Sequence, residues 1–203
     1  MKNARMPDPN RHTPGPITQY LQQWQAGDPD ALHHLTAAVY AELRRLAAAM
    51  LRGRYPGCLQ PTELVHELYL ELHKAKHIKA ENKVQFLGLA SSVMRNLLVD
   101  HARKRNAAKR GGGAIQIEFS DSLASGAAVD VLIVHDLLLR FAESYPRQAD
   151  VVELRFFGGL TAVESVEILR ARGHDTSVRT VDRDWRFARA WLQSALTVAS
   201  IQE

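Results

Sequence analysis

The chain has 203 residues, 46% of them hydrophobic, and its 26 Lys and Arg against 22 Asp and Glu give a net charge of +4. This length permits one or two small domains, and the mild basic excess suits a polyanionic partner. A single cysteine, Cys58, excludes an internal disulfide and a thiolate zinc site, which fits a cytoplasmic protein. The N-terminal MKNARMPDPNRHTPGP lacks the apolar core of a secretion signal, and we expect no membrane segment because every apolar run is short.

Helical periodicity fills most of the chain, so the predicted fold class is all-α. Residues 1–16 are polar and proline-rich, which is typical of a disordered tail. Residues 17–26 are expected to form a short helix that ends at Gly27. A longer helix is predicted over residues 28–51, with Asp28 as its N-cap and Pro29 at its first position. Its buried stripe comprises Leu32, Leu35, Val39, Leu43 and Leu46.

Two further helices complete the first half. QPTELVHELYLELHKA is predicted to start its helix at Pro61, with an apolar face of Leu64, Leu68 and Leu72 and with Val65 beside it. After the turn KAENK, the stretch VQFLGLASSVMRNLLVDHARKRNAAKR predicts a long helix with a very basic end. The apolar face expected for that helix comprises Phe86, Leu89, Ala90, Val93, Leu97 and His101.

The second half begins after GGGAIQIEFSDSLASGAA, which is rich in Gly, Ser and Ala and predicts a flexible linker. Only AIQIEFS, residues 114–120, shows any strand-like alternation. Three helices are then predicted in DVLIVHDLLLRFAES, in PRQADVVELRFF up to Gly158 and Gly159, and in TAVESVEILRA. In the last of these, Thr161 and Glu164 have the spacing of a capping box.

A fourth helix is predicted in RTVDRDWRFARAWL, residues 179–192, and it has two distinct faces. At about 100° per residue, Arg179, Arg183 and Arg186 fall within roughly 60° of one another, with Arg189 somewhat to the side. The opposite side collects Val181, Trp185, Ala188 and Leu192. A cationic stripe on the last helix of a helix, turn and helix is typical of a helix-turn-helix that enters the major groove. Trp191 is expected to belong to the core.

The predicted organisation is therefore a tail over residues 1–16, helical domains over 17–106 and 130–203, and a linker over 107–129. The order of the motifs resembles that of extracytoplasmic-function (ECF) RNA polymerase sigma factors. FLGLASSVMRNLLVDHARKR resembles the element that melts and reads the minus-ten promoter box. VVELRFFGGLTAVESVEIL with RTVDRDWRFARAWL resembles the reader of the minus-thirty-five box. The branch called ECF-like is resembled by four segments together: LRRLAAAMLR, LQPTELVHELYLEL, LLVDHARKR and AKRGGGA.

This resemblance implies an alternative sigma factor that binds promoter DNA and core RNA polymerase, through the clamp coiled coil and the flap, without catalysis or cofactors of its own. The residues expected at the minus-thirty-five box are Ser177, Arg179, Thr180, Arg183, Arg186 and Arg189. Those expected at the minus-ten box are Asn96, Asp100, Arg103, Lys104 and Arg105. His101 is expected to be packed, and the loop from Lys79 to Lys83 to receive a flipped base.

The helix that would grip the polymerase departs from the family pattern. That helix usually opens with several acidic residues, but here Gln60, Pro61, Thr62 and Glu63 occupy those positions. The expected polymerase-binding residues are Thr62, Glu63, His66 and Glu67. A phosphate on Thr62 would restore negative charge at a helix N-terminus. The resemblance to branches associated with Ser/Thr kinases implies a kinase as a partner. The alternative is that Thr62 is an ordinary polar residue of a first turn.

Three further points stay open at the level of sequence. RARGHDTS separates Leu169 from Val178 by more than a tight turn, so either the first helix runs on or the turn carries a loop. His73 and His77 have the i, i+4 spacing of metal ligands, but HELYL is not a zinc-protease motif, and we expect neither a metal site nor an enzyme. The main alternative function is a helix-turn-helix regulator that does not join polymerase.

Overall fold

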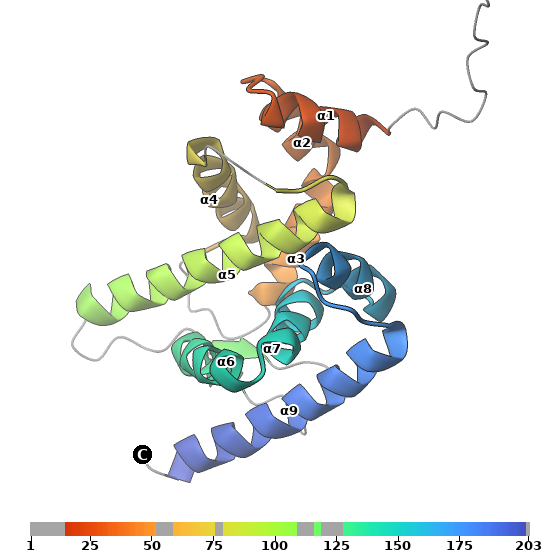
Figure 1. Ribbon diagram of the computed structural model, residues 1–203. Helices are drawn as coiled ribbons and strands as arrows, with labels where there is room; N and C mark the ends of the chain where they lie inside the picture. Colours follow the sequence, from red (N-terminus) through yellow and green to blue (C-terminus); the bar gives the residue numbers. More distant parts are fainter. Residues whose placement is uncertain (1–14, 52–58, 76–78, 109–115, 119–127, 202–203) are drawn as a thin grey trace, which may run out of the picture.

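The computed structural model describes residues 15–51, 59–75, 79–108, 116–118 and 128–201. These residues are almost entirely helical, which confirms the predicted all-α class (Figure 1). Most of the predicted tail, Cys58, His77 and most of the predicted linker lie outside the described residues. No described helix is both long enough and apolar enough to cross a membrane.

The first half contains α1 (Pro16–Gln25), α2 (Ala31–Ala38), α3 (Tyr40–Met50), α4 (Pro61–Lys74) and α5 (Lys83–Ala108). Helix α4 begins at Pro61, as predicted, because proline lacks only an N–H that the first turn does not use. Its predicted face of Leu64, Val65, Leu68 and Leu72 is buried. In Figure 1, α5 crosses the molecule between the first-half helices and the second half.

The prediction of one helix over residues 28–51 is wrong in two respects. The N-cap is Asp30, and its N–H donates to Oδ1 of Asp28 at 3.0 Å, so Asp28 and Pro29 form a turn ahead of the helix. Val39, with φ −116° and ψ 13°, then separates α2 from α3. The predicted stripe is nevertheless buried throughout. The kink lets α2 pack on α1 while α3 packs on α4 and α5.

The second half begins with a short antiparallel ribbon, in which β1 (Gln116–Glu118) pairs with β2 (Ala128–Asp130) and Ile117 lies opposite Val129. The strand-like alternation at 114–120 therefore has a structural counterpart. The remaining elements are α6 (Val131–Ser144), α7 (Pro146–Val152), the π-helical turn η1 (Glu153–Phe157), α8 (Ala162–Ala171) and α9 (Val178–Ile201). Asp130 caps α6 by accepting the N–H of Leu132 at 2.8 Å.

The predicted helix over residues 146–157 ends at Gly158, but its last five residues form η1 rather than an α-helical turn. The N–H of Gly158 donates to the carbonyl of Glu153 at 2.9 Å, five residues back. A Cβ on Gly158 would lie 2.4 Å from the carbonyl oxygen of Leu154, a contact that no side chain tolerates. The absence of a side chain at Gly158 therefore permits the π-helical turn.

The apolar face predicted for α5 is only partly correct. Phe86 and Ala90 are fully buried, but the buried row continues through Met94, Leu98 and Ala102. The predicted Leu89, Val93, Leu97 and His101 are half-buried. Apolar residues occur on several sides of this helix, so periodicity alone does not select one face. The apolar residues of the half-buried row lie along a groove.

Both halves share one apolar core. Buried residues from α1 to α9 form a continuous cluster, and α5 packs against α6, η1 and α8. Figure 1 shows α8 and α7 beside α5, and α9 on the side away from α1. In this structure the two predicted domains are therefore in direct contact through α5.

Candidate nucleic-acid interface

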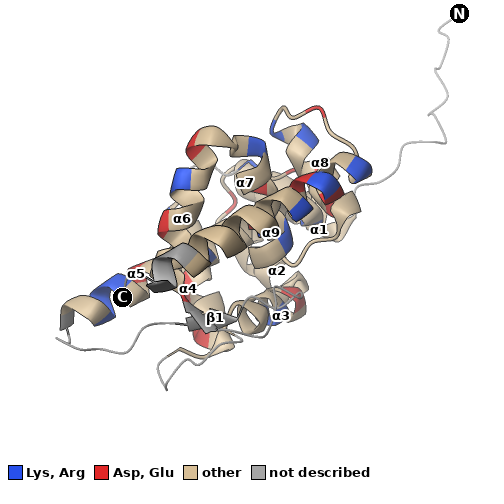
Figure 2. Ribbon diagram, turned by 90° about the horizontal axis from the view of Figure 1, so that it is seen from below, with Lys and Arg blue, Asp and Glu red and all other residues tan. Residues whose placement is uncertain are grey.

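Helix α9 separates its charged face from its apolar face as the sequence predicts. Val181, Trp185, Ala188 and Leu192 are buried, whereas Arg179, Arg183 and Arg186 are exposed. Arg189 is half-buried, and its guanidinium carbon lies 5.8 Å from the centroid of the Trp185 ring. Trp191 packs against the core but is only partly buried. Figure 2 shows basic residues gathered on the half of α9 that begins beside α8.

The start of α9 is fixed by its own polar residues. The hydroxyl of Ser177 accepts the N–H of Thr180 at 3.2 Å and lies 3.0 Å from the hydroxyl of Thr180. This is an N-cap arrangement, and it leaves the exposed Ser177 at the tip of the helix. Helix N-termini carry partial positive charge, so the tip suits a phosphate oxygen.

The long turn before α9 is braced at both ends. Helix α8 runs to Ala171, two residues beyond Leu169, and residues 172–177 form a connecting loop. The first helix is therefore longer than the motif requires, and the turn also carries a loop. Asp150 of α7 binds Arg172 at 2.6 Å and His174 at 3.0 Å. Arg170 donates twice to the carbonyl of Thr176, at 3.1 and 2.9 Å. The predicted capping box at Thr161 and Glu164 starts α8.

Sequence reasoning missed a buried carboxylate on α9. Asp184 is 3% exposed and accepts from Arg147 Nε at 2.7 Å and from Gln148 Nε2 at 3.2 Å. This contact fixes the rotation of α9 against α7, because a buried charge that loses its partner is strongly unfavourable. The signal was present in the sequence, since Asp184 falls on the apolar side of the helix beside Val181 and Ala188.

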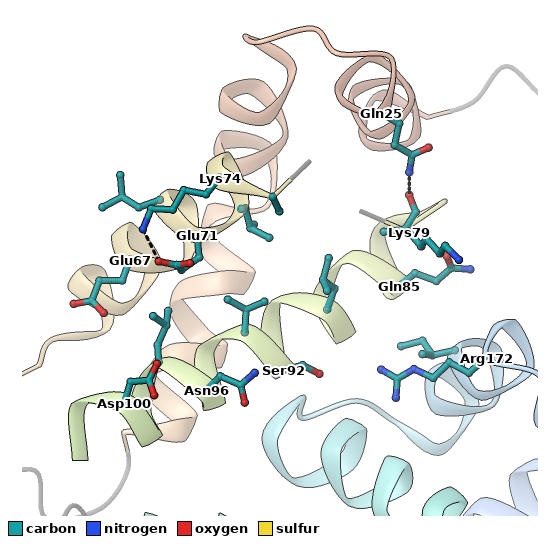
Figure 3. Close-up of a pocket in the computed structure, with 18 of the residues that line it drawn as sticks. Gln25, Glu67, Glu71, Lys74, Lys79, Gln85, Ser92, Asn96, Asp100 and Arg172 are labelled. Atoms are coloured by element: carbon teal, nitrogen blue, oxygen red, sulfur yellow. Dashed lines mark hydrogen bonds and ion pairs between the residues drawn. The ribbon is translucent and has the colours of Figure 1, made fainter. Parts of the chain in front are cut away.

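A groove of about 1230 Å³ runs along α5 and contains part of the predicted minus-ten set. Figure 3 shows Asn96 and Asp100 on α5, Glu67 and Glu71 on the facing α4, and Arg172 on a third side. The lining includes the half-buried Leu89, Val93 and Leu97, and apolar surface of this kind suits the stacking of an unpaired base. Lys104 also lines the groove.

The remaining basic residues of the minus-ten set differ in accessibility. Arg103 is exposed outside the lining of the groove, and Arg105 is half-buried. Figure 2 shows basic residues towards the far end of α5 as well as on α9. The groove is therefore polar and mixed in charge, and of the three basic residues in the minus-ten set only Lys104 lines it.

The described part of the loop from Lys79 to Lys83 is held by several side chains. Gln25 of α1 donates to the carbonyl of the buried Ala80 at 2.8 Å. Gln85 accepts the N–H of Glu81 at 2.9 Å, and Lys83 pairs with Glu42 of α3. The hydrogen bond from Lys83 lowers the pKa of the Glu42 carboxyl below its usual 4.5. Lys79 itself is exposed at the mouth of the groove.

The predicted polymerase-binding residues lie on α4, where Thr62, Glu63 and His66 are exposed. The carboxylates of Glu63 and Glu67 both have partners within the protein. Oε2 of Glu63 accepts the N–H of Gln60 at 2.6 Å, and Oε2 of Glu67 lies 2.7 Å from Nε2 of His101 on α5. His73 stacks beside Tyr69, and the described residues contain no group of three or more candidate metal ligands.

These features are typical of an all-helical, DNA-binding protein. One of its surfaces is a cationic helix-turn-helix, and the other is a polar groove along α5. Residues 14–198 match the family described as ECF sigma factor, and the chain belongs to that family. No curated protein matches the chain significantly. As an ECF sigma factor it acts in transcription initiation, where it binds core RNA polymerase and promoter DNA.

Proposed function

We propose that this sigma factor reads its promoter with two surfaces and joins polymerase with a third, in the cytoplasm. Ser177, Arg179, Thr180, Arg183, Arg186 and Arg189 contact the minus-thirty-five box, and Asn96, Asp100, Arg103, Lys104 and Arg105 the minus-ten strand. The segregated faces of α9 are the main support, because exposed arginines above a buried apolar stripe suit a helix that lies in a groove. The groove along α5 supports the second contact.

The docking surface on α4 is short of negative charge, and this supports control by modification. Glu63 caps its own helix and Glu67 is paired with His101, so neither carboxylate is fully available to a basic partner. Thr62 is exposed in the first turn of α4, between Pro61 and Glu63. A phosphate there adds about −1.5 to −2 charge beside the positive end of the helix. We therefore propose that a Ser/Thr kinase activates the protein at Thr62.

The test is the affinity of the full chain for core RNA polymerase before and after treatment with a Ser/Thr kinase. We expect phosphorylation to tighten binding by about tenfold, the equivalent of about 1.4 kcal/mol for one restored charge contact. Thr62→Glu should give a smaller gain, and Thr62→Ala should abolish the kinase effect. Run-off transcription from the chain's own upstream DNA should follow the same order.

Thr197→Glu is the matched control, because it places the same charge on an exposed threonine of α9, away from α4. It should leave polymerase affinity unchanged. If Thr62→Ala initiates transcription in cells as well as the wild type, phosphorylation control at Thr62 is wrong while the sigma role stands. If the chain binds promoter DNA but never core polymerase, in either modification state, it acts instead as a regulator that does not join polymerase.

A further inference from the structure

A carboxylate lies in the middle of the cationic face of α9. Asp182 comes three residues after Arg179 and four before Arg186, so all three side chains emerge on one face of the helix. The side chain of Asp182 is 51% exposed. The other acidic residue of α9 is Asp184, which is buried and bound to α7. The two carboxylates therefore have different roles.

The fold makes little use of Asp182. Among the described residues its carboxylate has one partner, Nη1 of Arg155 on η1, at 3.5 Å. A long ion pair with an exposed side chain contributes little to stability. Arg155 is also held without Asp182, because its guanidinium carbon lies 5.8 Å from the centroid of the Trp185 ring. Nε of Arg186 donates to the backbone carbonyl of Asp182 at 3.3 Å rather than to its carboxylate. Packing therefore does not explain an acidic residue at this position.

A carboxylate on this face is unfavourable for DNA binding in general. It repels the phosphate backbone and offsets part of the attraction supplied by Arg179, Arg183 and Arg186. Specificity, however, is a difference of affinities, so a group that weakens binding to most sequences improves discrimination if one sequence can satisfy it. The carboxylate of Asp182 therefore suits a role in selecting the base sequence.

The bases differ in how their major-groove edges receive a carboxylate, which accepts hydrogen bonds and donates none. Guanine presents two acceptors, thymine an acceptor and a methyl group, and adenine an acceptor beside its amino group. Cytosine presents an amino donor without an acceptor beside it. A cytosine is therefore the base that satisfies a carboxylate best.

Asp182 is well placed for such a contact, because it is the fifth residue of α9 after the N-cap Ser177. The N-terminal residues of a recognition helix are the ones that contact base edges. We propose that Asp182 accepts a hydrogen bond from the amino group of a cytosine in the minus-thirty-five box and so determines the base at one position. This inference rests on the minus-thirty-five surface proposed above.

The experiment is a selection of promoter DNA by the full chain in complex with core RNA polymerase. The library carries the chain's own upstream DNA with the minus-thirty-five box randomised, and the bound fraction is sequenced. The wild type should favour cytosine at one position by about tenfold over the other bases. Asp182→Ala should lose this preference at that position alone. It should also bind boxes that lack the cytosine about threefold more tightly, because the repulsion of the phosphates is removed.

Asp182→Asn distinguishes a direct contact from an indirect one. An amide pairs with both the amino group and N7 of adenine, so this variant should gain a preference for adenine at the same position. A residue that acted only through the packing of α9 would not exchange one base for another. The side chain is exposed, so both variants should keep the fold.

Two control variants separate base recognition from net charge and from packing. Asp136→Ala removes the same charge from an exposed position on α6 and should leave the selected sequence and the affinity unchanged. Arg155→Gln removes the partner of Asp182 within the protein and should keep the preference for cytosine.

The role of Asp182 is wrong if the wild type selects a box without a preferred cytosine, or if Asp182→Ala selects the same box as the wild type. It is also wrong if Arg155→Gln loses the preference as fully as Asp182→Ala, since the effect then arises from the packing of η1 against α9. If the wild type in complex with polymerase selects no sequence at the minus-thirty-five box, the proposed function itself fails.

Discussion

At the scale of single residues, His135 shows how the contact between the halves constrains a titratable group. Burial and then the nearby positive charges of Arg95 and Arg103 lower the pKa of His135 below its ordinary 6.5, while Asp136 and Glu153 oppose them. Because arginine is always a donor, Nδ1 of the ring must accept from Arg95 and the ring proton must sit on Nε2. The folded protein therefore favours the neutral ring.

A pH dependence of stability follows from this lowered pKa. Below about pH 6.5 the unfolded chain takes up a proton that the folded chain accepts less readily, so the free energy of unfolding should fall as the pH drops from about 7.5 to 5.5. His135→Gln keeps an acceptor for Arg95 but does not titrate. Urea unfolding at both pH values should show a smaller loss in the variant. An equal loss in both proteins would contradict this role for His135.

At the scale of elements, α9 depends on contacts made by its buried side. Asp184 and the apolar stripe fix its rotation against α7, so the direction of the arginine stripe is a property of the packed helix rather than of the arginines alone. The braced loop from Arg172 to Ser177 fixes where the helix begins. Substitutions on the exposed face should therefore alter binding without altering the fold.

Arg183→Ala tests this separation of roles. If Arg183 makes a bidentate hydrogen bond to a base, its loss should cost about 1–3 kcal/mol of promoter affinity at that base pair. If Arg183 contacts a phosphate instead, its loss should reduce the slope of log K against log salt concentration by about one unit. Promoter affinity measured over a range of salt concentrations distinguishes the two. Arg140→Ala removes an exposed arginine from α6 and should change neither quantity. If Arg183→Ala has unchanged promoter affinity at every salt concentration, Arg183 does not contact the DNA.

Sequence periodicity predicted the elements well and their long-range partners poorly. The helix starts at Pro61 and Thr161 and the two faces of α9 were predictable, because caps and single-sided stripes are local signals. The buried face of α5 was not predictable, because α5 carries apolar residues on several sides and the helices that pack on it are distant in sequence. The pairing of Arg95 with Glu153 was equally invisible, because each residue taken alone looks like an ordinary surface charge.

At the scale of the whole molecule, the shared apolar core should make the chain unfold as one unit. Trp24 lies in the first half and Trp185 and Trp191 in the second, so single-tryptophan variants report each half separately. We expect the urea transitions seen by fluorescence of each half and by circular dichroism to coincide in the wild type. In Gly88→Leu, whose side chain would collide with Ile168 of α8 and Leu154 of η1, we expect the transitions to diverge. Separate transitions in the wild type would show two independent folding units.

Gly88 has a consequence for α5 itself. Glycine inside a helix costs about 1 kcal/mol relative to alanine, and here the lost propensity coincides with the spot where Ile168 and Leu154 press against the backbone. Without those neighbours, this part of α5 would have neither a side chain nor external support. We therefore expect α5 to be most easily bent about two turns ahead of Asn96, next to the segment proposed to contact the minus-ten strand.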